Sequence, residues 1–153
     1  MSTVALREIT TDNWEECIQL KISEDQAGYV EPNVVSLAES RVHPWMLPLA
    51  IYAEDNMVGF VMYSDERDPR LPRYWIHRLM IDKRHQSRGY GRAAMLAVIA
   101  RLQQKSDCDE IWVGYVSHNE PARRFYASLG FVEQGPAPWG DHELVARLTI
   151  DAG

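Results

Sequence analysis

The chain has 153 residues, of which 46% are hydrophobic and 25% are charged, and its formal net charge is −6. This composition is typical of one soluble globular domain that buries roughly two-thirds of its unfolded surface. No apolar run approaches the ~20 residues that a bilayer-spanning helix needs, and the N-terminus lacks the pattern of a secretion signal. We therefore expect a single domain over residues 1–153 and no membrane partner.

The two cysteines indicate the redox environment of the protein, and the charge distribution indicates the kinds of ligand that it binds. Cys17 and Cys108 are far apart and form no CxxC motif, which is typical of reduced thiols in a cytoplasmic protein. Residues 1–45 hold eight acidic and three basic side chains, whereas residues 67–105 hold ten basic and two acidic ones. A basic centre in an acidic chain argues against a nucleic-acid partner. It favours an anionic ligand at the centre and a cationic one near the acidic third, although an uneven solvated surface also explains that third.

The first half of the chain predicts two helices among three strands. Apolar alternation indicates a strand over residues 4–9, and Thr11, Asp12 and Asn13 offer caps for a helix over 14–21. Pro32 suits the first turn of a helix over 33–42, which Pro44 and Pro48 end. Two apolar runs around a polar turn then predict a hairpin, with its strands at 49–53 and 57–63.

The second half alternates strands with helices. We expect strands over 74–82, 111–116, 131–134 and 142–150, with helices over 89–104 and 120–129. The whole order is then β-α-α-β-β-β-α-β-α-β-β. A hairpin meander followed by strand–helix–strand predicts an α+β fold, with a mixed, mainly antiparallel sheet of about seven strands flanked by helices.

The stretch from Met80 to Arg92 predicts an anion site. An apolar strand is followed by five basic side chains and two glycines within ten residues, and a helix then begins. Unpaired backbone N–H groups and the positive end of the helix dipole attract anions at such a helix start. Arg84, Arg88 and Arg92 add positive charge. The alternative is an ordinary loop-to-helix turn with solvated arginines.

A second motif lies about thirty residues later. Gln86-x-x-Gly89-x-Gly91 after a strand, followed by Asn119, Ala122 and Phe125-Tyr126-x-x-x-Gly130-Phe131, resembles the GNAT superfamily of acetyl-CoA-dependent N-acetyltransferases. The order of elements matches the fold of that superfamily along nearly the whole chain. The resemblance implies that acetyl-CoA is the cofactor and that an amine accepts the acetyl group by direct attack. No metal site is implied.

The resemblance also assigns roles to residues. The pyrophosphate of coenzyme A would bind to backbone N–H groups, with Arg92 nearby; these groups belong to Gln86, Ser87, Arg88, Gly89, Tyr90 and Gly91. Met80 and Ile81 would pair through their backbone with the pantetheine arm, and Asn119 would hydrogen-bond to it. Tyr126 would lie near the sulfur, where a phenol can supply the proton that a leaving thiolate needs. The alternative for Tyr126 is an aromatic ring that packs a helix onto the sheet.

His77 is the candidate base. An ammonium with a pKa near ~10 must lose a proton before it attacks, so a base or a water relay is useful. His77 falls where some polyamine acetyltransferases of the superfamily carry a glutamate base, and a histidine titrates near neutrality. The residue type departs from that pattern, and a hydrogen-bonded core histidine is the equally plain alternative.

Two segments indicate the acceptor. Residues 20–38 and 74–82 are similar to bacterial spermine/spermidine acetyltransferases, which implies a polyamine substrate. Carboxylates and aromatic faces suit a polycation, and the candidates besides His77 are Glu24, Asp25, Tyr29, Glu31 and Trp75. Charges on a solvated face are the alternative. An amino acid, an aminoglycoside or a protein N-terminus stays open as the acceptor, as does a non-catalytic acyl-CoA-binding module. Exposed tryptophans such as Trp139 suit a homodimer, by analogy only.

Overall fold

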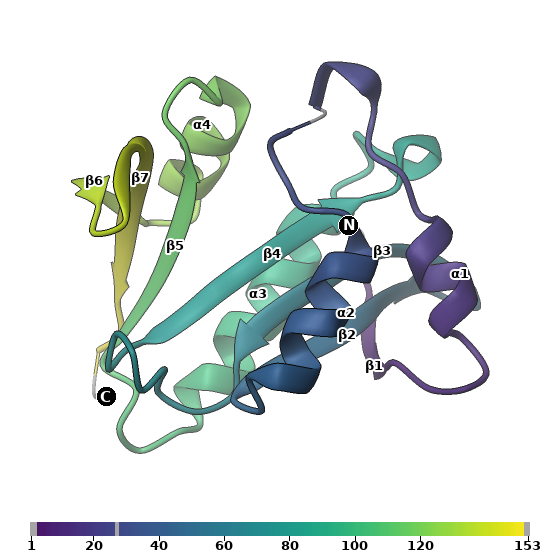
Figure 1. Ribbon diagram of the computed structural model, residues 1–153, viewed down its shortest axis with the longest axis horizontal. Helices are drawn as coiled ribbons and strands as arrows, with labels where there is room; N and C mark the ends of the chain where they lie inside the picture. The colour runs from purple at the N-terminus through teal and green to yellow at the C-terminus, as the bar shows by residue number, and fades with distance from the viewer. Residues whose placement is uncertain (1–2, 27, 152–153) are drawn as a thin grey trace.

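In the computed structural model, which describes residues 3–26 and 28–151, seven strands form one sheet in the order β1-β2-β3-β4-β5-β7-β6 (Figure 1). Neighbouring strands are antiparallel except β4 and β5, which are parallel. The predicted α+β class and mixed, mainly antiparallel sheet are confirmed. The strands are β1 (Ala5–Glu8), β2 (Met46–Ala53), β3 (Asn56–Ser64), β4 (Tyr74–Ile81), β5 (Glu110–Val116), β6 (Val132–Ala137) and β7 (Gly140–Thr149).

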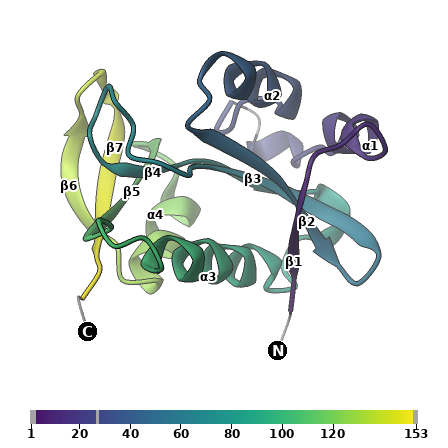
Figure 2. The same ribbon diagram turned by 90° about the horizontal axis from the view of Figure 1, so that it is seen from below.

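Helices cover both faces of the sheet, as Figure 2 shows. α1 (Trp14–Gln19) and α2 (Asn33–Val42) lie on one face, and α3 (Tyr90–Gln103) and α4 (Glu120–Ser128) lie on the other. Two short 3₁₀ helices, η1 (Glu24–Gln26) and η2 (Lys83–His85), occur in segments that were expected to be loops. No helix in the described ranges is both long and apolar enough to cross a membrane.

The largest apolar core lies between the sheet and α3. Ala94, Met95, Val98 and Leu102 are fully buried on one stripe of α3, and strand β3 contributes Val58, Val61 and Tyr63. The spacing of the four residues from α3 is that of a helix face that packs on a sheet. This core fixes where α3 begins, and therefore where the loop before it lies.

The structure corrects two predicted boundaries. β2 begins at Met46 and runs through Pro48, which was expected to end the preceding helix. β1 pairs only with Leu49 to Tyr52, so at Pro48 β2 has a single neighbouring strand and tolerates a residue without an N–H. β6 runs through Gly135 and Pro136 to Ala137, where a loop was expected, because it is an edge strand with register shifts at these residues.

Two irregularities of β4 open the sheet. Tyr63 pairs with Ile76 and Met62 pairs with Arg78, so His77 is the extra residue of a β-bulge. β4 pairs with β5 only from Tyr74 to Ile76, and beyond this point the two strands separate (Figure 1). The sheet is therefore continuous at one end of β4 and split at the other.

Candidate active site

A cleft of about 1140 Å³ lies where β4 and β5 separate. Its walls come from these strands, the start of α3, α4, the segment between α1 and α2, and the β6–β7 hairpin. Every residue that the sequence predicted for the site lines this cleft except Glu24, Arg84 and Arg88. Glu24 lines an adjoining cavity of about 400 Å³, which shares Glu31 and Met80 with the cleft.

The turn between β4 and α3 is built around the buried carboxylate of Asp82. This group accepts hydrogen bonds from the backbone N–H of Lys21 (3.0 Å) and from the N–H (3.0 Å) and Nε (2.8 Å) of Arg84. Burial alone would raise the pKa of Asp82, but these hydrogen bonds outweigh it and hold the pKa below its usual value. Asp82 is therefore an ionised anchor that ties the α1–η1 segment to the turn.

Left-handed backbone conformations shape the end of this turn. Ser87 has φ +64° and Gly89, the residue before α3, has φ +83°. No side chain in the described part of the chain caps the start of α3. A turn of this kind directs successive backbone N–H groups into one concave surface, which suits an anionic phosphate.

The side chain of Gln86 links the turn to its neighbours. Its Nε2 donates to the carbonyl of Ile81 and to Oε1 of Gln26, both at 2.9 Å. Gln26 belongs to η1, and Tyr29 farther along packs edge-on against His118 with ring centroids 5.5 Å apart. The segment between α1 and α2 therefore reaches both sides of the cleft.

The edge of β4 beyond the bulge fits an extended ligand. From His77 to Ile81, β4 has no partner strand on its β5 side among the described residues. On that side its backbone donors and acceptors face the cleft, where a chain that contains amide groups can continue the sheet pattern. The carbonyl of Met80 points toward Gly59 of β3, and the carbonyl of Ile81 accepts a hydrogen bond from Gln86. The expected backbone pairing of Met80 and Ile81 with a pantetheine arm therefore stays a prediction.

Tyr126 belongs to an aromatic cluster and also lines the cleft. Its half-buried ring stacks on Tyr115 with centroids 5.9 Å apart and contacts Phe125 and Phe131 edge-on. Burial, with a smaller effect of Tyr115, raises the pKa of Tyr126 above its usual value, so the phenol keeps its proton at neutral pH. Packing and proton donation are thus compatible roles for this residue.

Asn119 begins α4 at the edge of the cleft. Its Oδ1 accepts a hydrogen bond from the backbone N–H of Ala122 at 3.2 Å, and Pro121 occupies the first turn, as the sequence predicted. The amide of Asn119 is therefore held in place by its capping role while the residue lines the cleft.

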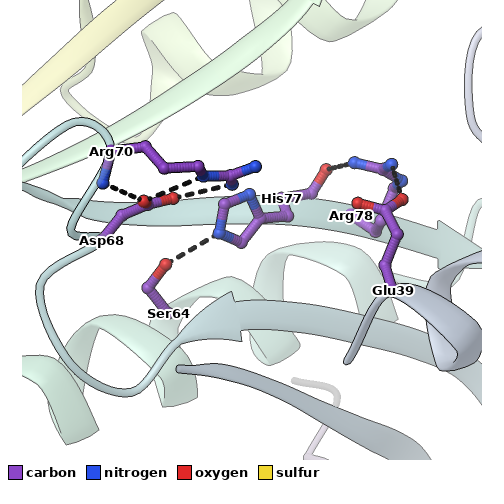
Figure 3. Close-up of polar contacts among 6 residues, drawn as sticks. All are labelled: Glu39, Ser64, Asp68, Arg70, His77 and Arg78. Carbon is purple, nitrogen blue, oxygen red and sulfur yellow. Dashed lines mark hydrogen bonds and ion pairs between the residues drawn. The ribbon is translucent and has the colours of Figure 1, made fainter. Parts of the chain in front are cut away.

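His77 projects from the bulge beside Ser64 and Arg70 (Figure 3). Its Nε2 is hydrogen-bonded to the fully buried Oγ of Ser64 at 2.7 Å. Arg70 forms an ion pair with Asp68 at 2.9 Å, and Arg78 forms one with Glu39 at 2.6 Å.

These surroundings keep the imidazole of His77 neutral. Burial lowers the pKa of His77 to about 4; Asp68 opposes this shift, while Arg78, Arg70 and His43 add to it. His77 is thus both hydrogen-bonded in the protein and in contact with the cleft. The hydrogen bond to Ser64 agrees with the alternative of a hydrogen-bonded histidine, and the role of a base stays a prediction.

Several lining residues were missed in the sequence. Tyr115 lines the cleft and donates from its hydroxyl to Glu133 at 3.0 Å, while Arg123 also holds Glu133, at 2.9 Å. Trp139 and Glu143 line the cleft from the β6–β7 hairpin. Tyr115 carries no motif, and the hairpin was expected to contain a loop. Within the described ranges, no group of three or more His, Cys, Asp or Glu side chains is placed to hold a metal ion.

A sequence profile described as the acetyltransferase (GNAT) family matches residues 4–131. The chain belongs to the GNAT family of acetyltransferases. The predicted membership, the enzyme class and the use of acetyl-CoA are thereby confirmed at the level of the family.

Relatives extend over nearly the whole chain. A spermine/spermidine N(1)-acetyltransferase of Bacillus subtilis strain 168 is 27% identical over 149 residues, which cover 95% of this chain and 98% of the relative. The structure of a spermidine N-acetyltransferase from Vibrio cholerae in complex with CoA and spermine aligns with a TM-score of 0.70 at 18% identity, over 97% of this chain and 95% of that one. An N-acetyltransferase from Thermoplasma acidophilum in complex with coenzyme A aligns with a TM-score of 0.69 at 14% identity, over 97% and 99%. These structures share the fold.

The depressed pKa of His77 predicts how stability changes with pH. A histidine in an unfolded chain has a pKa near ~6.5, so between that pH and about 4 the unfolded state binds more protons than the folded state. The contribution of His77 to the free energy of unfolding is therefore complete above about pH 6.5, and it is lost as the pH falls toward 4. Urea unfolding of wild type and His77→Gln at several pH values measures this.

The variant should show a shallower fall in the free energy of unfolding than the wild type over this range. His142→Gln, at an exposed position, is the control and should keep the wild-type slope. Equal slopes for the wild type and His77→Gln would contradict the assigned burial of His77.

Proposed function

We propose that this protein transfers the acetyl group of acetyl-CoA to a primary amine of a polyamine of the spermine and spermidine kind. The observation that carries the proposal is the cleft between β4 and β5. Both family motifs line one part of it, and carboxylates with aromatic rings line another. The similarity to a Bacillus subtilis spermine/spermidine N(1)-acetyltransferase supports the choice of acceptor.

The cofactor-binding part of the cleft lies around the β4–α3 turn. Acetyl-CoA supplies an activated acetyl group in the form of a thioester. The backbone from Gln86 to Gly91, with Arg88 and Arg92 nearby, would hold its pyrophosphate. The free edge of β4 up to Ile81, together with Asn119, would orient the arm that carries the thioester.

His77 is the proposed acceptor of the amine proton. Moving a proton from an ammonium with a pKa near ~10 to an imidazole with a pKa of about 4 costs roughly 8 kcal/mol. An enzyme that turns over about ten times per second has a barrier of roughly 16 kcal/mol, and the free energy of this proton transfer is well below that barrier. Because Ser64 already occupies Nε2, the proton would be transferred to Nδ1 of His77, either directly or through a water.

Tyr126 is the proposed proton donor to the departing sulfur. Its raised pKa keeps the hydroxyl protonated before the reaction, and its stacking on Tyr115 limits the orientations of the ring. A positioned acid of this kind contributes about 10²–10⁴-fold to rate in other enzymes.

The acceptor would lie between the α1–α2 segment and the bulge. Asp25, Tyr29, Glu31 and Trp75 line the cleft, and Glu24 lines the adjoining cavity. A flexible polycation can pair with carboxylates on this side while one nitrogen reaches His77. Cytoplasmic location and a homodimer remain predictions.

Release of coenzyme A measured with a panel of amines tests the proposed acceptor. We expect turnover with spermine and spermidine at a higher kcat/KM than with amino acids, aminoglycosides or peptides that bear a free N-terminus. Turnover confined to one of those other classes would contradict the polyamine assignment. Binding of coenzyme A with no turnover of any amine would instead identify a non-catalytic module.

Replacement of Tyr126 by Phe tests the proton donor. The variant should lower kcat about a hundredfold while changing the affinity for acetyl-CoA by less than about twofold, because the ring stays in place and only the acid is lost. Tyr115→Phe, which removes the hydroxyl of the stacked neighbour, is the matched control and should have a smaller effect on kcat. Equal losses in the two variants would remove Tyr126 from the proposed role.

A further inference from the structure

The β6–β7 hairpin places Trp139 across the cleft from His77. The parallel pairing of β4 with β5 ends at Ile76 and Val113, so His77 and Gly114 are the next residues in register, on opposite sides of the opening. A Cβ on Gly114 would lie 3.6 Å from Cζ2 of Trp139, which shows that the indole rests on the backbone of β5 at this level.

Trp139 is held in position by two neighbours. Its Nε1 donates a hydrogen bond to Oε2 of Glu143, and its ring packs against Trp75 with centroids 5.6 Å apart. Trp75 is 3% exposed and packs in turn on Trp112, whereas Trp139 is 49% exposed. Trp139 and Glu143 both line the cleft. A half-exposed indole and a carboxylate are therefore fixed side by side on the β5 side of the cleft, whereas His77 lies on β4.

This pair suits a cation. The hydrogen bond from Trp139 uses one acceptor position of the Glu143 carboxylate, and a carboxylate has about four. An aromatic face next to a carboxylate attracts an ammonium through both cation–π and charge-assisted hydrogen bonding. The arginines nearest this cluster are otherwise engaged: Arg73 lies over Trp112, and Arg147 pairs with Glu110 at 3.3 Å. His142 of the hairpin and Tyr115 of β5 also line this part of the cleft.

We infer that Trp139 and Glu143 bind an ammonium group of the acceptor other than the nitrogen that is acetylated. This inference rests on the proposed function. A nearby carboxylate stabilises the charged form of an amine, whereas the attacking nitrogen has to be neutral. Glu143 therefore suits a second nitrogen, with the reacting one at His77 on the opposite wall. The subsite makes a second positive charge a requirement for efficient acetylation.

The test compares an amine that has a second charge with one that lacks it. In Glu143→Gln, kcat/KM for spermidine should fall about tenfold, the usual effect of losing a hydrogen bond to a charged group, whereas kcat/KM for n-butylamine should change by less than about twofold. Asp141→Asn makes the same change in net charge on the same hairpin at an exposed residue outside the cleft lining, and it should leave both values unchanged.

Tryptophan variants test the ring. Trp139→Leu should lower kcat/KM for spermidine more than kcat/KM for n-butylamine. Trp139→Phe should show a smaller loss for spermidine, because it keeps an aromatic face. Thermal unfolding of each variant, compared with the wild type, checks that the protein remains folded. A fall in Glu143→Gln that is equal for the two amines, or no larger than in Asp141→Asn, would overturn the subsite.

Calorimetric titration of spermidine separates this inference from the proposed function. If the wild type acetylates no polyamine, the proposed acceptor is wrong, and binding alone then decides the subsite. Weaker binding by Glu143→Gln than by the wild type and Asp141→Asn supports it. Equal binding by the three proteins, or no binding by the wild type, overturns it.

Discussion

The short pairing between β4 and β5 is the constraint on which the rest of the structure depends. Three residue pairs join the strands, and beyond Ile76 the bulge at His77 turns β4 away from β5. On its other side β4 stays close to β3, where Gly59 is required because a Cβ would lie 2.4 Å from the carbonyl oxygen of Met80. β4 thus pairs with β5 at its start and leaves an unpaired edge on that side at its end.

Charges around the opening are arranged so that the imidazole at the bulge stays neutral. The nearby arginines Arg70 and Arg78 each have a carboxylate partner, Asp68 and Glu39. Burial of His77 then lowers its pKa more than these charges do. The phenol of Tyr126 keeps its proton for a similar reason, since burial disfavours its anion. Both groups are in the protonation states that their proposed roles as base and acid need at neutral pH.

Features encoded within short segments were predictable from sequence, and features that depend on pairing between distant segments were not. The turn from Gln86 to Gly91 and the start of α4 at Asn119 follow from local capping and glycine geometry. The low pKa of His77 depends on its burial at the bulge where β4 pairs with β3, and its hydrogen-bond partner Ser64 lies thirteen residues away in the chain. Trp139 and Glu143 reach the cleft only because β6 continues through Pro136 as an irregular edge strand, which its composition argued against.

Amide hydrogen exchange followed by NMR, with and without coenzyme A, tests the central claim that the open edge of β4 and the following turn hold the cofactor. Coenzyme A should slow exchange at residues 78–81 whose N–H groups are not bonded to β3, and at residues 87–91. Exchange at residues 74–76, which β5 already pairs, should not change. Protection that is absent from both segments while coenzyme A binds elsewhere would contradict the account.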